Sequence, residues 1–196
     1  MLQKLLNFLF KKQIFTKDLK EMPPDDFICK YLLAEGQIVV REGLAQQLYE
    51  LYGQHWKIVD TRQTGKTLGA TFGILYRVLR ISESQRVFIV SYGKGNSKRI
   101  IKDIKDILLR IQSKVGFKIS KNNTENFTIY TSNKTISFEV ISLNQYTMRG
   151  NQSDNTILFA DETQYFDKKY YDALVETMSY ILSKTKNSLF VSTRLS

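Results

Sequence analysis

The apolar positions of this chain alternate between two spacings. Short continuous runs of apolar, β-branched and aromatic residues predict buried strands. Apolar residues three or four positions apart predict helices that bury one face. The predicted strands are 56–60, 87–91, 127–131, 135–141, 157–160 and 188–192, and the predicted helices are 27–33, 44–52, 65–79, 96–115 and 170–182.

The order of these elements indicates the fold class. Strands that alternate with helices predict an α/β fold with a mostly parallel sheet and helices on both faces. Residues 1–22 fit an amphipathic helical arm that ends at Pro23 and Pro24. We therefore expect an N-terminal helical arm or subdomain at 1–43 and one core domain at 44–196.

Charge and composition indicate which classes of partner this protein can bind. The net charge of +10 favours a polyanion such as DNA or RNA, and the alternative is a basic, well-solvated surface. The basic stretch Lys94–Lys105 leaves the same two interpretations open. The single Cys29 and single His55 exclude an internal disulfide and argue against a Cys/His zinc site. No segment reaches the roughly 18 apolar residues of a membrane span, so we expect no membrane partner.

A phosphate-binding loop is predicted between the strand at 56–60 and the helix that follows. Gly65 lets the backbone approach a phosphate, and the N–H groups at the start of the helix attract an anion. Lys66 would reach the β- and γ-phosphates, and the Thr67 hydroxyl would ligate Mg²⁺. The first glycine of the usual motif is replaced by Asp60, which places a carboxylate near the phosphates.

A pair of carboxylates follows the apolar strand at 157–160. Asp161 comes at the carboxyl edge of that strand, where α/β sheets bind ligands. Asp161 would hold Mg²⁺ through water, and Glu162 would orient and deprotonate the attacking water. The alternative is an acidic pair that only caps the next helix. Together with the phosphate loop, the pair predicts an enzyme that hydrolyses ATP.

These motifs resemble the ATPase domain of the large terminase subunits of tailed phages and herpesviruses. The resemblance covers about residues 44–193 and implies a RecA-like P-loop NTPase core. Five segments carry it in order: Ala45–Tyr49, Thr61–Thr67, Phe88–Tyr92, Met148–Asn151 and Phe190–Thr193.

The resemblance implies a role for each matching position. Thr61, Arg62, Gln63, Thr64, Gly65, Lys66 and Thr67 would bind ATP, with either Gln46 or Gln47 on the adenine. Arg62 would be an arginine finger supplied in cis, although a phosphate ligand or a surface ion pair stays open. Arg149 would be a finger, a DNA contact or a structural ion pair. Ser192 and Thr193 would couple hydrolysis to movement, the alternative for Thr193 being a satisfied hydroxyl at a strand end.

The same resemblance implies partners and a setting. It implies a motor that uses ATP and Mg²⁺ to move double-stranded DNA into a procapsid, as a ring of subunits with a portal and a small terminase subunit. The setting would be the cytoplasm or nucleus of an infected cell, without secretion. We expect a core incomplete at its C-terminal side and no nuclease activity. Two other functions stay open: a helicase-like ATPase, and a nucleotide-binding assembly module with weak turnover.

Overall fold

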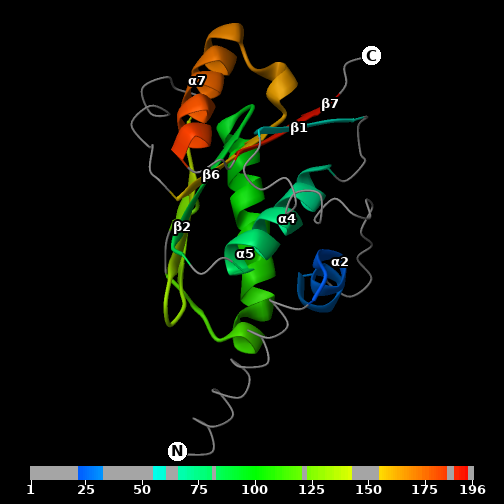
Figure 1. Ribbon diagram of the computed structural model, residues 1–196, viewed down its shortest axis with the longest axis vertical. Coiled ribbons are helices and arrows are strands. Elements are labelled where there is room, and N and C mark those ends of the chain that lie inside the picture. Colours follow the sequence, from blue (N-terminus) through cyan, green and yellow to red (C-terminus); the bar gives the residue numbers. More distant parts are fainter. Residues whose placement is uncertain are drawn as a thin grey trace, which may run out of the picture.

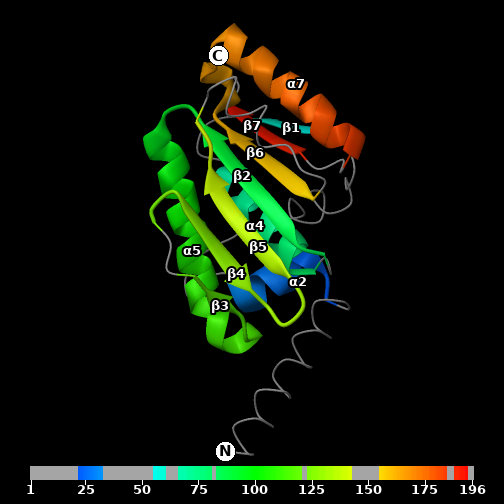
Figure 2. The same ribbon diagram turned by 90° about the vertical axis from the view of Figure 1, so that its left-hand side faces the viewer.

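The structure is a computed structural model that describes residues 22–32, 55–60, 66–80, 83–120, 123–142, 155–184 and 188–193. Within these ranges, seven strands form one sheet in the order β1-β7-β6-β2-β5-β4-β3 (Figures 1 and 2). The strands are β1 (His55–Asp60), β2 (Gln85–Ser91), β3 (Lys118–Ile119), β4 (Asn126–Tyr130), β5 (Thr135–Val140), β6 (Thr156–Asp161) and β7 (Ser188–Thr193). The helices are α2 (Pro24–Phe27), the π-helix η1 (Ile28–Leu32), α4 (Lys66–Arg80), α5 (Lys94–Val115), the 3-10 helix η2 (Thr163–Tyr165) and α7 (Lys168–Lys184).

The sheet is mostly parallel, as predicted. Strands β1, β7, β6, β2 and β5 pair in parallel, and β4 and β3 complete the sheet in antiparallel pairing. Parallel strands point the same way, so their carboxyl ends meet at one edge. Asp60, Ser91 and Asp161, the last residues of β1, β2 and β6, therefore share that edge.

Helices cover both faces of the sheet because the central strands are apolar on both sides. Val87 and Ile89 of β2 belong to the core cluster beneath α4 and α5, which lie together on one side (Figures 1 and 2). Phe88 and Val90, the alternate residues, pack in a second cluster with Leu174 of α7. A strand buried on both faces reads as a continuous apolar run, which is the pattern that predicted β2.

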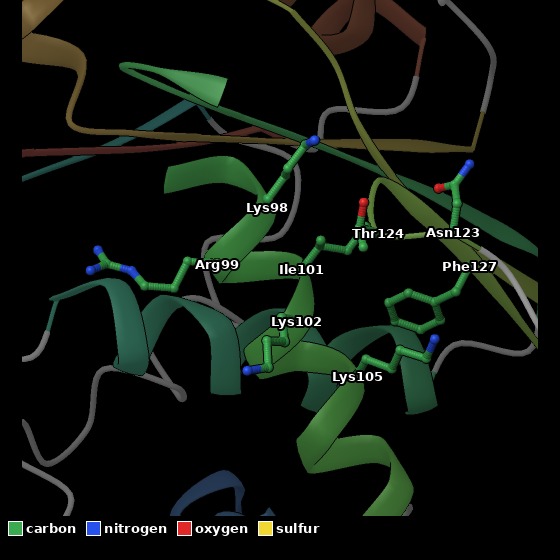
Figure 3. A pocket seen from close by; sticks show the side chains of 8 residues that line it. All are labelled: Lys98, Arg99, Ile101, Lys102, Lys105, Asn123, Thr124 and Phe127. Carbon is green, nitrogen blue, oxygen red and sulfur yellow. The ribbon is translucent and has the colours of Figure 1, made fainter. Parts of the chain in front are cut away.

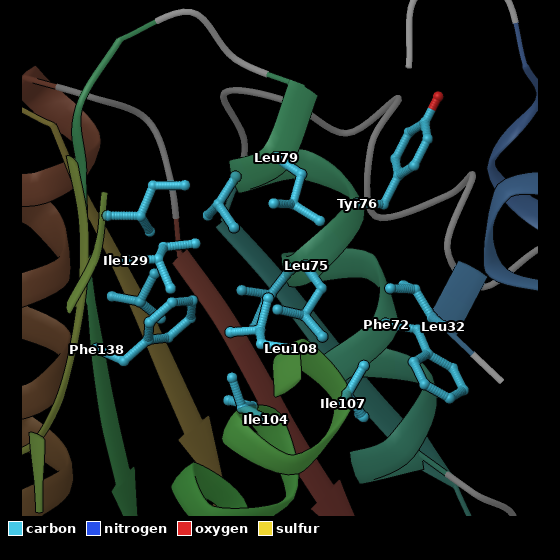
Figure 4. Close-up of a cluster of buried hydrophobic side chains, with 14 of the residues drawn as sticks. Leu32, Phe72, Leu75, Tyr76, Leu79, Ile104, Ile107, Leu108, Ile129 and Phe138 are labelled. Carbon is cyan, nitrogen blue, oxygen red and sulfur yellow. The ribbon is translucent and has the colours of Figure 1, made fainter. Parts of the chain in front are cut away.

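The larger cluster joins α4, α5 and the N-terminal helical turn (Figure 4). Leu75 and Leu108 are fully buried where α4 and α5 meet, and burial of each contributes about 2 kcal/mol. Leu32 of η1 joins the same cluster. The described part of the predicted N-terminal arm therefore shares the core of the sheet domain. The rest of that arm, the helix predicted at 44–52 and the boundary at 43 lie outside the described residues.

Local chemistry sets where several helices begin and end. Pro24 occupies the first turn of α2, where its missing N–H costs nothing. Gly116 ends α5 with a φ of 80° and donates its N–H to the Gln112 carbonyl. The buried Lys134 ammonium donates to the carbonyls of Val78 and Leu79 near the end of α4. Among the described residues, no helix combines the length and hydropathy needed to cross a membrane.

Candidate active site

The start of α4 and the end of β6 meet at the carboxyl edge of the sheet. Lys66 and Thr67 are the first two residues of α4, directly after the predicted phosphate loop. The Thr67 hydroxyl donates a hydrogen bond of 3.0 Å to Oδ1 of Asp161. The two residues are 94 positions apart in the chain, so only the fold brings them together. The structure thus places a threonine hydroxyl and a carboxylate at one point, as a shared magnesium site requires.

Asp161 is a buried carboxylate. It is 3% exposed, and burial raises its pKa to about 6. The hydrogen bond from Thr67 lowers this pKa, the neighbouring Glu162 charge raises it, and the Arg99 guanidinium of α5 lowers it. A buried carboxylate that is ionised at neutral pH is stabilised by a cation at its free oxygen.

Glu162 has an unusual backbone conformation. Its φ of 55° and ψ of 40° are left-handed, which makes it the one non-glycine residue of the described chain with positive φ. Such a conformation costs about 1–3 kcal/mol and is concentrated at functional sites. The turn sends the chain from β6 into η2, and the Gln164 side-chain amide donates a hydrogen bond to Oε2 of Glu162. One carboxylate oxygen of Glu162 is therefore oriented by a residue two positions away.

Ser91 is a site residue that the sequence did not identify. It ends β2 and pairs in register with Asp161 of β6. Its side chain is 3% exposed, and its Oγ forms no hydrogen bond within the described part of the chain. A buried hydroxyl without a partner beside a carboxylate is suited to bind a water or an ion. The sequence signal was a serine that ends an apolar strand, which is too common to be specific.

The residues at this edge fit a magnesium ion. The donors are oxygens, from the Asp161 carboxylate and the Thr67 and Ser91 hydroxyls, and Mg²⁺ prefers oxygen ligands. The described residues contain no cluster of three or more His, Cys, Asp or Glu side chains that would cage a metal. Mg²⁺ bound through one carboxylate, water and substrate phosphates needs no such cage.

Of the other predicted site residues, the structure describes only some. Strand β7 lies between β1 and β6, and Ser192 and Thr193 pair with Val59 and Asp60 at the end of β1. The backbone of the predicted coupling segment thus borders the strand that leads to the phosphate loop. The remaining predicted positions, Gln46, Gln47, Thr61, Arg62, Gln63, Thr64, Gly65 and Arg149, lie outside the described residues.

Comparison with known proteins gives a likeness in structure alone. No protein-family model matches the sequence, and no curated protein matches it. The large terminase ATPase domain of Thermus phage P74-26 has a TM-score of 0.61 and 13% identity, over 90% of this chain and 72% of that domain. The large terminase of a thermophilic bacteriophage has a TM-score of 0.58 and 15% identity, over 77% of this chain and 37% of its own length.

The second of these proteins has also been solved with ligands. Its complex with ATP-gamma-S has a TM-score of 0.56 and 16% identity, over 76% of this chain and 36% of that one. Its complex with ADP is similar at the same TM-score, with 15% identity over 76% of this chain and 38% of that one. At these identities the likeness concerns the fold. The chain has the RecA-like α/β fold of phage large terminase ATPase domains, as the resemblance in its motifs implied.

Proposed function

We propose that this chain is the ATPase motor domain of a DNA-packaging terminase, which hydrolyses ATP to move double-stranded DNA into a procapsid. The observation that carries the proposal is the contact between Thr67 and Asp161. A P-loop NTPase holds its metal between a threonine or serine after the loop and an acidic residue at a strand end. The fold shared with terminase ATPase domains supports the same conclusion.

The proposed chemistry assigns a task to each residue at the edge. Thr67 and Asp161 would hold Mg²⁺, which would neutralise the negative charge that develops on the phosphates. Lys66, at the N-terminus of α4, would bind phosphate with the positive end of the helix. Glu162 would accept the proton of the attacking water, and Gln164 would keep its carboxylate oriented.

The remaining roles belong to the same proposal. Arg62 supplies the finger in cis, Gln46 or Gln47 contacts adenine, and Ser192 and Thr193 couple the site to movement. The motor would work as a ring of subunits with a portal, a procapsid and a small terminase subunit, in the cytoplasm or nucleus of an infected cell. These roles rest on the resemblance in the motifs, and the domain from Thermus phage P74-26 shares the fold in which they would act.

ATP turnover with and without double-stranded DNA tests the proposal. We expect Glu162→Gln to lower kcat about 10²–10⁴-fold while Mg²⁺–ADP binding persists, because only proton transfer is lost. Glu83→Gln makes the same chemical change at an exposed position before β2 and should turn over normally. Unchanged turnover in Glu162→Gln would reject the proposed base. Separation of duplex strands by the wild type would favour a helicase, and tight nucleotide binding without turnover an assembly module.

A further inference from the structure

A hollow of about 690 Å³ lies between α5 and the residues that lead into β4 (Figure 3). Side chains of α5 project from one side, and Asn123, Thr124 and Phe127 face them from the other. Phe127 and Ile101 are only 1% and 3% exposed. Phe127 and Ile101 are thus covered themselves, and the apolar surface that lines the hollow comes from the carbon chains of the side chains around them. Its residues that remain accessible are mostly cations.

Four lysines of α5 follow one stripe along the helix. At about 100° per residue, Lys94, Lys98, Lys102 and Lys105 fall within a sector about 80° wide. We call these four residues the lysine stripe. It borders the buried face of α5 and spans about 16 Å of helix, which equals the rise of roughly five phosphates of one strand measured along the duplex axis. A stripe of one sign at this length matches a regular polyanion better than a single anionic group.

The acidic residues of α5 point elsewhere. Asp103 and Asp106 lie about 140° and 80° from the centre of the lysine stripe. Burial raises the pKa of Asp103 and the neighbouring Asp106 raises it further, whereas the charges of Arg99 and Lys102 lower it. Asp103 thus interacts with Arg99 and with Lys102 of the stripe, although its own direction on the helix lies away from the centre of the stripe.

One carboxylate contacts the stripe. Glu125 accepts ion pairs from Lys94 and Lys98 at 2.8 and 2.9 Å. Lys102 and Lys105 form no ion pair within the described residues. Lys105 instead lies over the Phe127 ring at 5.9 Å, with its charge at the rim of the hollow. Within the described residues Glu125 is the one carboxylate that forms ion pairs with the stripe, so the four ammonium groups keep a net positive charge.

We propose that the lysine stripe binds the phosphate backbone of duplex DNA. This rests on the proposed function, for which it supplies the surface that holds the transported strand. A second partner would be an acidic protein segment, but the four lysines follow one line for about 16 Å, which fits the evenly repeated charge of a phosphate backbone, and the binding test separates the two partners. The stripe also lies near the nucleotide edge, since α5 starts three residues after Ser91, the register partner of Asp161.

The salt dependence of DNA binding tests the proposal. The probe is a fluorescein-labelled 30-base-pair duplex, and its anisotropy is followed from low to moderate salt without nucleotide. The test variant is Lys98→Gln/Lys102→Gln/Lys105→Gln. The matched control, Lys114→Gln/Lys118→Gln/Lys169→Gln, removes three exposed charges from other surfaces. Removing three phosphate contacts should reduce the slope of log K against log salt by about 2.7, and the control should keep it.

Two further measurements make the result specific. Thermal unfolding followed by circular dichroism should be the same for all three proteins, and DNA-independent ATP turnover should persist in the test variant. An unchanged slope, or an equal loss in the control, would overturn the proposal. A labelled polyglutamate peptide that binds more tightly than DNA, and only to the wild-type stripe, would do the same. The duplex measurement needs no turnover, so it stays readable if the proposed ATPase activity is absent.

Discussion

The buried charge of Asp161 should destabilise the nucleotide-free fold, and Asp161→Asn should remove that cost. The variant keeps the size of the side chain and an oxygen that accepts the Thr67 hydrogen bond. In the wild type, burial raises the Asp161 pKa from 3.8 to about 6. The folded state therefore binds this proton more tightly than the unfolded chain does. Stability is lost as the pH rises from about 4 to about 6, and the full cost applies above that range.

The difference between these pKa values corresponds to about 3 kcal/mol at pH 7.5. We expect Asp161→Asn to raise the free energy of unfolding by up to that amount, and the midpoint of thermal unfolding by about 6–12 °C. At pH 4 the folded carboxyl is almost fully protonated and the unfolded one is protonated in about two-fifths of the molecules, so only a small part of the cost applies at this pH. The gain should then fall below about 1 kcal/mol.

Urea unfolding followed by circular dichroism, in buffer with EDTA and without nucleotide, measures both values. With Mg²⁺ and ADP added, the order should reverse, because the wild type binds the ligand and gains its binding free energy. A variant that is less stable than the wild type at pH 7.5 would refute the reasoning. So would a gain of the same size at pH 4, because it would show that ionisation is not the cause.

Three other outcomes follow from single contacts. Gln164→Ala should lower kcat about tenfold at an unchanged KM for ATP, because the Glu162 carboxylate loses the amide that orients it; steady-state kinetics would show an unchanged kcat if that contact is idle. Glu162→Gly should be about 1 kcal/mol more stable to urea than Glu162→Ala, because only glycine adopts a φ of 55° without strain; equal stabilities would contradict this. Leu75→Ala should cost about 2–5 kcal/mol in the same assay, since Leu75 is fully buried; a smaller loss would mean that the core closes around the gap.

Local pattern was enough to predict most of the sheet. The centres of β2 and β6, residues 87–90 and 157–160, are apolar at every position because helices cover both faces of the sheet. The spacing of Ile100, Ile104 and Ile111 in α5 follows its buried face. The order of the strands could not be read from the chain, because β7 is last in sequence yet lies between β1 and β6. The short strand β3 also escaped prediction, since two residues carry no period.

The candidate site likewise contains residues that could be predicted from the sequence and residues that could not. Thr67 could be predicted because it lies at the start of a strongly patterned helix, and Asp161 because it ends a strongly apolar strand. The fold brings the two side chains into contact. Ser91 and the orientation of Glu162 could not be found in this way. The first depends on strand register, and the second on a left-handed turn that glutamate rarely adopts. The roles of Arg62, Arg149 and the adenine-contacting glutamine stay predictions.

The end of β2 has a mechanical consequence. Ser91 is aligned with Asp161 on the neighbouring strand, and only Tyr92 and Gly93 separate it from the first residue of α5. The ring of Tyr92 contacts that of Tyr165, on the turn that carries Glu162, with 5.5 Å between their centroids. A displacement of Asp161 or Glu162 is thus transmitted to α5 through a connection of only two residues, Tyr92 and Gly93. A rotation of α5 by a few degrees would swing its far end farther than its near end.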